Sequence, residues 1–154
     1  MPNVHKTLMI LLAASLLPLA STSVNAAEPT VITLTQTGCQ FTEPEGKDHG
    51  FKTMGSADCK AINSKSGKKR LAGSKTITLK PGKYIFRVTN KNVPYQLGFY
   101  LRGAGVGRLT LPKVSGGGLV KGKSRDYHIT LKAGDYYYSC PLNPTPDYAL
   151  KVTN

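Results

Sequence analysis

The residues with the clearest capacity for chemistry are three cysteines and one short acidic segment. The cysteines are Cys39, Cys59 and Cys140, and the segment holds Glu43, Glu45, Asp48 and His49. Thiolate sulfur and imidazole nitrogen suit copper, whereas carboxylate oxygen shifts a site toward a harder or more oxidised ion. These residue types predict a metal site if the fold brings them together; otherwise the acidic segment is a solvated turn.

The beginning of the chain has the layout of a secretory signal peptide. Lys6 supplies a cationic head, an apolar run extends from Leu8 to Ala20, and small side chains surround Ala26. The run is shorter than the about 20 residues that a permanent membrane helix needs. We expect cleavage after Ala26, which gives a periplasmic or secreted protein of residues 27–154 with no transmembrane segment. An uncleaved anchor is the alternative.

In an exported protein the cysteines also allow a structural interpretation. Two neighbouring cysteines usually form a disulfide in an oxidising compartment, and an odd number leaves one sulfur over. In the chain-entropy model, a long loop closed by Cys39 and Cys140 contributes about 4.7 kcal/mol, and a short loop closed by Cys39 and Cys59 about 3 kcal/mol. The second pairing leaves Cys140 free for a metal. The sequence leaves both pairings open.

Apolar residues alternate with polar ones along most of the chain after Val31, as in half-buried strands. The alternating sets are Ile32 and Leu34; Ile77 and Leu79; Tyr84, Phe86 and Val88; Tyr95, Leu97, Phe99 and Leu101; Tyr127, Ile129 and Leu131; Tyr136, Tyr138 and Cys140; and Tyr148, Leu150 and Val152. About seven short strands predict an all-β sandwich. The turn at residues 80–83 predicts a hairpin between its flanking strands.

Residues 40–74 break this pattern. They have no sustained period and are rich in charge, glycine and serine. We interpret them as an insertion or long loop after the first strand, in which residues 57–64 could hold a single helical turn. Loops of this length tend to be functional or disordered.

Two stretches resemble the cupredoxin family. The first is residues 78–90, TLKPGKYIFRVTN, followed by Val93, Pro94 and Tyr95; the second is residues 131–141, LKAGDYYYSCP. The resemblance covers residues 75–154 and, more loosely, residues 31–39. It implies a cupredoxin-like Greek-key β-sandwich over residues 27–154, with a long insertion after the first strand.

A blue-copper site needs one thiolate, two imidazoles and a weak axial ligand. Tyr95 stands where the resemblance expects the first histidine, and the loop of residues 140–147 contains neither histidine nor methionine. An ordinary blue-copper site is therefore not expected.

The chain is most similar to the cupredoxin-like domains of bacterial periplasmic iron- and copper-uptake proteins. In those domains, one cysteine after the first strand and one at the end of a tyrosine-rich strand bind copper or iron with an acidic residue. Here Cys39 and Cys140 match the two cysteines, and the acidic residue is missing. Replacement ligands would have to come from the insertion, so we predict a site of Cys140, Cys39 and His49 with Glu45 or Glu43, for copper in preference to iron.

The formal charge of +13 is concentrated in residues 60–75 and 121–125. Export and the absence of a base-stacking module argue against nucleic acid as a partner. An acidic redox or transport protein, or an anionic membrane surface, fits the charge better. No catalytic motif occurs in the sequence, so we do not expect an enzyme.

These observations lead to two hypotheses. The first is an exported metal-binding protein with a non-blue copper site, acting as a metal carrier or electron-transfer partner. The alternative is a metal-free, disulfide-stabilised cupredoxin-like module that docks an acidic partner through its basic surface.

Overall fold

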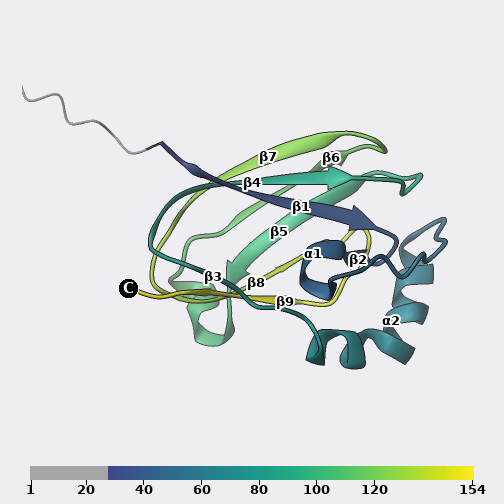
Figure 1. Cartoon of the computed structure of the whole chain (residues 1–154), viewed down its shortest axis with the longest axis horizontal. Coiled ribbons are helices and arrows are strands. Elements are labelled where there is room, and N and C mark those ends of the chain that lie inside the picture. Colours follow the sequence, from purple (N-terminus) through teal and green to yellow (C-terminus); the bar gives the residue numbers. More distant parts are fainter. Residues whose placement is uncertain (1–27) are drawn as a thin grey trace, which may run out of the picture.

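The structure is a computed structural model that describes residues 28–154. The expected signal peptide and its cleavage site lie outside the described residues. Two β-sheets face each other, and a long helix packs against one end of the sandwich (Figure 1). Within residues 28–154, no helix is long and apolar enough to cross a bilayer.

The four-stranded sheet has the order β2-β1-β4-β7. Its strands are β1 (Thr30–Thr37), β2 (Gln40–Phe41), β4 (Gly82–Asn90) and β7 (Ser124–Leu131). The five-stranded sheet has the order β3-β9-β8-β5-β6. Its strands are β3 (Ile77–Leu79), β5 (Leu97–Gly103), β6 (Val114–Leu119), β8 (Gly134–Ser139) and β9 (Tyr148–Val152). The pairs β1–β4 and β3–β9 are parallel, and the others are antiparallel.

The core forms where the alternating apolar residues of both sheets meet. The largest fully buried side chains are Tyr136, Tyr138, Tyr148, Phe41, Phe86 and Phe99. Phe41 packs edge-to-face on Phe99, Tyr138 and Tyr148, at centroid separations of 5.4 to 6.1 Å. Such pairs add to the free energy of area burial. The predicted all-β sandwich is confirmed, because period-two patterning fixes which face of each strand is buried.

Two details of the strand prediction differ from the structure. The sandwich has nine strands where about seven were expected. The two additional strands are β2, which has only two residues, and β6, in which three consecutive glycines interrupt the alternating pattern. The predicted hairpin at residues 80–83 was wrong. β3 pairs with β9 in one sheet, and β4 pairs with β1 and β7 in the other, so this turn carries the chain between sheets.

The segment of residues 40–74 is more ordered than the sequence suggests. It contains β2, a short helix α1 (Thr42–Glu45) and the 17-residue helix α2 (Ser56–Ala72). The expectation of a single helical turn was therefore wrong. The buried face of α2 consists of Cys59, Gly67 and Arg70, with half-buried Asn63 between them. Since these residues are not an apolar stripe, the usual pattern of a packed helix is absent.

Candidate functional site

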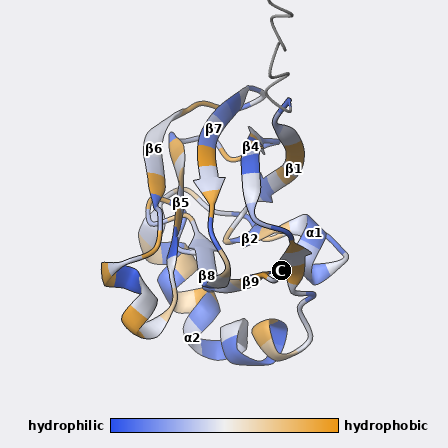
Figure 2. Cartoon of the chain, turned by 90° about the vertical axis from the view of Figure 1, so that its left-hand side faces the viewer, coloured by the Kyte–Doolittle hydropathy of each residue, from blue (hydrophilic) through white to orange (hydrophobic). Residues whose placement is uncertain are grey.

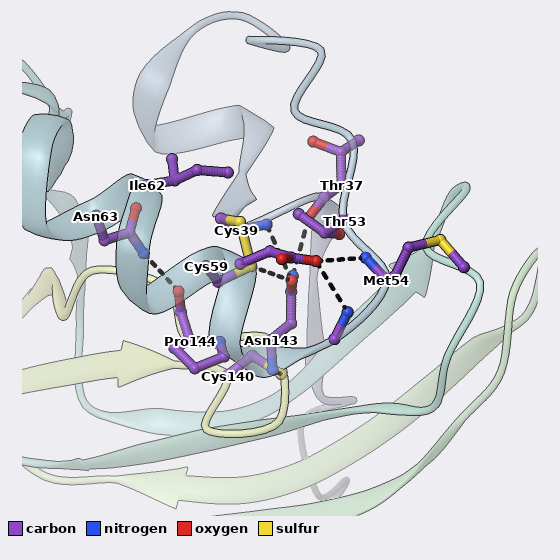
Figure 3. The surroundings of a disulfide bond; sticks show 12 residues. Thr37, Cys39, Thr53, Met54, Cys59, Ile62, Asn63, Cys140, Asn143 and Pro144 are labelled. Atoms are coloured by element: carbon purple, nitrogen blue, oxygen red, sulfur yellow. Dashed lines mark hydrogen bonds between the residues drawn. A yellow bond between two sulfur atoms is a disulfide. The ribbon is translucent and has the colours of Figure 1, made fainter.

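The three cysteines lie at the end of the sandwich covered by α2 (Figure 3). Cys39 and Cys59 form a disulfide that ties the turn between β1 and β2 to α2, and Cys140 is free. Of the two pairings left open by the sequence, the structure has the one that closes the shorter loop. The sulfur of Cys39 is therefore not a thiolate in this state.

Cys140 follows β8 and is 1% exposed. Its Sγ accepts hydrogen bonds from the backbone N–H groups of Gly98 and Asn143, each at 3.3 Å. Burial raises the pKa of the Cys140 thiol, and these N–H groups offset the increase only in part. The thiol is consequently neutral near pH 7 and shielded from solvent.

Asn143 joins the disulfide to the Cys140 loop. Its fully buried carboxamide accepts from the N–H of Cys39 at 2.9 Å and donates through Nδ2 to the carbonyl of Thr37 at 2.9 Å. Its Oδ1 also lies 3.1 Å from Sγ of Cys59. Figure 3 shows the Asn143 side chain between the disulfide and Cys140. The space between the three sulfur atoms thus contains a carboxamide with hydrogen-bond partners at both ends.

Tyr95 completes this cluster from the segment before β5. Its hydroxyl donates to Oδ1 of Asn143 at 3.1 Å and lies 3.3 Å from Oγ1 of Thr53. Burial raises the pKa of the Tyr95 phenol. The free thiol is therefore bonded by backbone N–H groups, and the Asn143 side chain connects its loop to a neutral phenol and to the disulfide.

Glu45 and His49, two of the predicted ligands, do come together, but next to Arg70. Nε2 of His49 lies 2.7 Å from Oε2 of Glu45, and Arg70 forms two hydrogen bonds of 2.9 Å with the same carboxylate. Tyr148 donates to Oε1 of Glu45. Burial alone would raise the pKa of Glu45, but the bonds from Arg70 and Tyr148 and the Arg70 charge outweigh it and lower the pKa. The Glu45 carboxylate is thus fully engaged in connecting α1, α2 and β9.

The other predicted ligands lie elsewhere. Oε2 of Glu43 accepts from the backbone N–H of Thr35 at 2.8 Å, and neither Glu43, Glu45 nor His49 contacts Cys140 by a hydrogen bond. No group of three or more His, Cys, Asp or Glu side chains placed to hold a metal ion occurs within residues 28–154. The structure therefore brings Glu45 and His49 together, and no hydrogen bond or ion pair joins the side chains of Cys39, Cys140 or Glu43 to either of them.

Sequence reasoning missed Asn143, Arg70 and Tyr148. A spacing of three residues in a proline-rich loop could have indicated that Asn143 returns to Cys140. Arg70 resembled one more residue of a basic run, although it is 9% exposed, while the neighbouring Lys68 and Lys69 are exposed. Nothing in the sequence pairs it with Glu45.

A solvent-filled pocket of about 400 Å³ adjoins the cluster through Thr53. We call it the lysine-flanked pocket. It is lined by Gly38, Phe51, Lys52, Thr53, Met54, Asn92, Val93, Pro94 and Lys121. Met54 is 82% exposed, and no acidic residue lines the pocket.

The lysine charges are unpaired across the described part of the chain. Every lysine of residues 28–154 is exposed, and none takes part in a salt bridge. The ion pairs of this region use Arg70, Arg87, Arg102 and His49. Of the eight acidic side chains, three pair with arginine and none with a lysine of this region, so the lysine charges are available to a partner.

Comparisons with known proteins bear on the fold. No protein-family model matches the chain, and no curated protein sequence matches it. The structure is similar to a solved structure of auracyanin B, a cupredoxin, with a TM-score of 0.51 and 14% sequence identity, over 87% of this chain and 96% of that chain. The chain accordingly has a cupredoxin-like fold.

Proposed function

We propose that the protein is an exported, non-catalytic and metal-free cupredoxin-like module that docks an acidic protein at the lysine-flanked pocket. The observation that carries this proposal is the side-chain set around Cys140. Tyr95 and Asn143 bond to each other beside the thiol, and the other two sulfurs form a disulfide. No imidazole is part of this set.

The fold by itself suggests a copper-binding or electron-transfer protein, so the fit of copper must be considered. Copper in such a site takes a thiolate and two imidazoles. The imidazole of His49 lies against Glu45, and His128 is exposed on β7. The donors beside Cys140 do not fit blue copper. The predicted Cys-His-carboxylate site would require Cys39 to leave its disulfide, and either Glu45 to leave Arg70 or Glu43 to leave the N–H of Thr35.

The lysine-flanked pocket has the features of a docking surface. Met54 and Pro94 supply exposed apolar area, while Lys52 and Lys121 supply charge on the same rim. Lys91 and Lys123 are exposed in neighbouring loops, whose backbones hydrogen-bond to Gln36 and Asn90. An apolar centre within a charged rim is typical of protein interfaces.

The partner's chemistry follows from the charge. Unpaired lysines attract acidic surfaces and increase the association rate, an effect screened over about 8 Å at physiological ionic strength. Binding should therefore weaken with salt, chiefly through the on-rate.

The test compares two charge-matched double variants with short poly-L-glutamate as the probe. Lys52→Glu/Lys121→Glu reverses two charges at the pocket, and Lys80→Glu/Lys83→Glu reverses two at the turn between β3 and β4. We expect the pocket variant to lose about tenfold or more in affinity, and the turn variant clearly less. Equal losses would mean diffuse attraction by net charge and would contradict a localised docking site.

A further inference from the structure

The turn between β5 and β6 exposes two aliphatic side chains almost completely. It forms the 3₁₀ helix η1 (Gly105–Leu109), in which Val106 is 90% and Leu109 is 89% exposed. The lysine-flanked pocket lies near the opposite end of β5, next to Tyr95. Figure 2 shows hydrophobic segments in this projecting turn.

Hydrogen bonds hold the backbone of this turn in place, so the exposure of Val106 and Leu109 is a property of the folded structure. Gly107 N–H donates to Ala104 at 2.9 Å, Leu111 N–H to Gly107 at 2.8 Å, and Ala104 N–H to Asp135 at 2.8 Å. A Cβ added at Gly103 would lie 2.2 Å from the carbonyl oxygen of Gly107, so the two backbone segments touch. The half-buried Leu111 packs at the base of the turn, which leaves Val106 and Leu109 outside.

Basic side chains surround the two aliphatic ones. Arg108 lies between them in the sequence, and Lys113 follows the turn; both are exposed. A groove of about 490 Å³ beside Val106 is lined largely by apolar groups, and its charged lining residues are one basic residue, Lys151, and one acidic residue, Asp135. Tyr137, 37% exposed, extends the apolar surface into this groove.

We propose that η1 is a membrane-contact site that inserts Val106 and Leu109 into the interfacial region of an anionic lipid surface. The turn is convex, so a protein partner would need a matching socket, whereas a lipid interface accepts a small apolar projection directly. Lysine and arginine side chains beside inserted apolar groups strengthen attachment to anionic lipids. The excess of basic residues in the whole chain acts in the same direction.

The membrane-contact site η1 and the lysine-flanked pocket lie near opposite ends of β5. β5 has seven residues, so its ends lie roughly 20 Å apart. A protein attached through η1 would keep the lysine-flanked pocket away from the lipid. The two sites can therefore be tested, and can fail, separately.

The sequence contains no tryptophan, so a single introduced tryptophan reports its own surroundings. The experiment adds vesicles of equimolar phosphatidylcholine and phosphatidylglycerol to Leu109→Trp and, as a control, to Met54→Trp. We expect a blue shift and quenching by brominated lipid for Leu109→Trp alone. An unshifted Leu109→Trp spectrum, or a shift confined to Met54→Trp, would overturn the proposal.

A second measurement removes the apolar groups without changing charge. Val106→Ser/Leu109→Ser should lower the vesicle partition coefficient about tenfold or more, whereas Met54→Ser should match the unmodified protein. Circular dichroism checks that each variant is folded, which we expect because the replaced side chains are exposed. Unchanged partitioning of the double variant would show that charge alone holds the protein to lipid and would contradict insertion.

Discussion

The hydroxyl of Tyr95 donates a hydrogen bond to Oδ1 of Asn143 at 3.1 Å, beside the buried thiol of Cys140. This bond connects two segments that approach the thiol from different parts of the chain. The same Oδ1 accepts from Cys39, whose sulfur is bonded to α2. Asn143 thus holds the disulfide, the Cys140 loop and the Tyr95 segment together.

Replacing Asn143 should destabilise the protein strongly. Asn143→Ala leaves the N–H of Cys39 and the carbonyl of Thr37 buried without partners, and we expect a loss of about 3 kcal/mol in the free energy of unfolding. Tyr95→Phe removes one bond to an oxygen that retains Cys39 as donor, so its loss should be about 1 kcal/mol. Urea denaturation measures both values. Equal losses would contradict the central role given to Asn143.

The Cys140 thiol should be unreactive while the protein is folded. Burial raises its pKa and excludes reagents. A chromogenic disulfide reagent at pH 8 should titrate no thiol in the folded protein and one in urea. After reduction in urea it should titrate all three cysteines. A rapidly reacting thiol in the folded protein would instead favour an accessible sulfur, as a metal carrier requires.

Acid should remove the stabilisation that Glu45 supplies. Because its folded-state pKa is lowered from 4.5, the contribution is complete above about pH 4.5 and is lost as pH falls through the folded pKa. Glu45→Gln should be less stable than the unmodified protein at pH 7, by about 3 kcal/mol for a broken buried ion pair. Its stability should also change less between pH 5 and pH 3. Parallel pH profiles for the two proteins would contradict this assignment.

Two buried tyrosines should respond differently to loss of the hydroxyl group. The hydroxyl of Tyr138 is buried without a hydrogen-bond partner, whereas that of Tyr148 donates to Glu45 and accepts from the N–H of Phe41. Tyr138→Phe should therefore be neutral or stabilising, and Tyr148→Phe should lower the free energy of unfolding by about 1–3 kcal/mol. Thermal unfolding of the two variants gives the comparison directly. The reverse order would be inconsistent with the hydrogen bonding described here.

The sequence predicts the strands of the sandwich well, but it predicts poorly the end of the sandwich that α2 covers. Burial of alternate residues, such as Tyr84, Phe86 and Val88, leaves a local signal that reading along the chain can detect. By contrast, α2 is held by a disulfide, by Asn63 donating to Pro144 and by Arg70 bonding to Glu45. These contacts join distant residues and leave no periodic pattern.

The candidate metal ligands show the same limit of prediction from sequence: contacts between distant residues leave no local pattern. His49 and Glu45 are four residues apart, and their contact was within reach of sequence reasoning. The position of Arg70 beside them was not within reach. Arg70 decides whether Glu45 can act as a metal ligand, because its guanidinium already binds the Glu45 carboxylate. Similarly, the free state of Cys140 depended on which partner Cys39 takes, which composition and spacing left undecided.

Copper titration tests the central claim most directly. The unmodified protein, with Cys140 as a free thiol, and the Cys140→Ser variant are each titrated with Cu(II) and then with Cu(I), because a thiolate is the sulfur ligand that such a copper site requires. We predict no sulfur-to-copper charge-transfer absorption in either protein. Absorption in the unmodified protein that Cys140→Ser abolishes would contradict a metal-free module and restore the copper-site hypothesis.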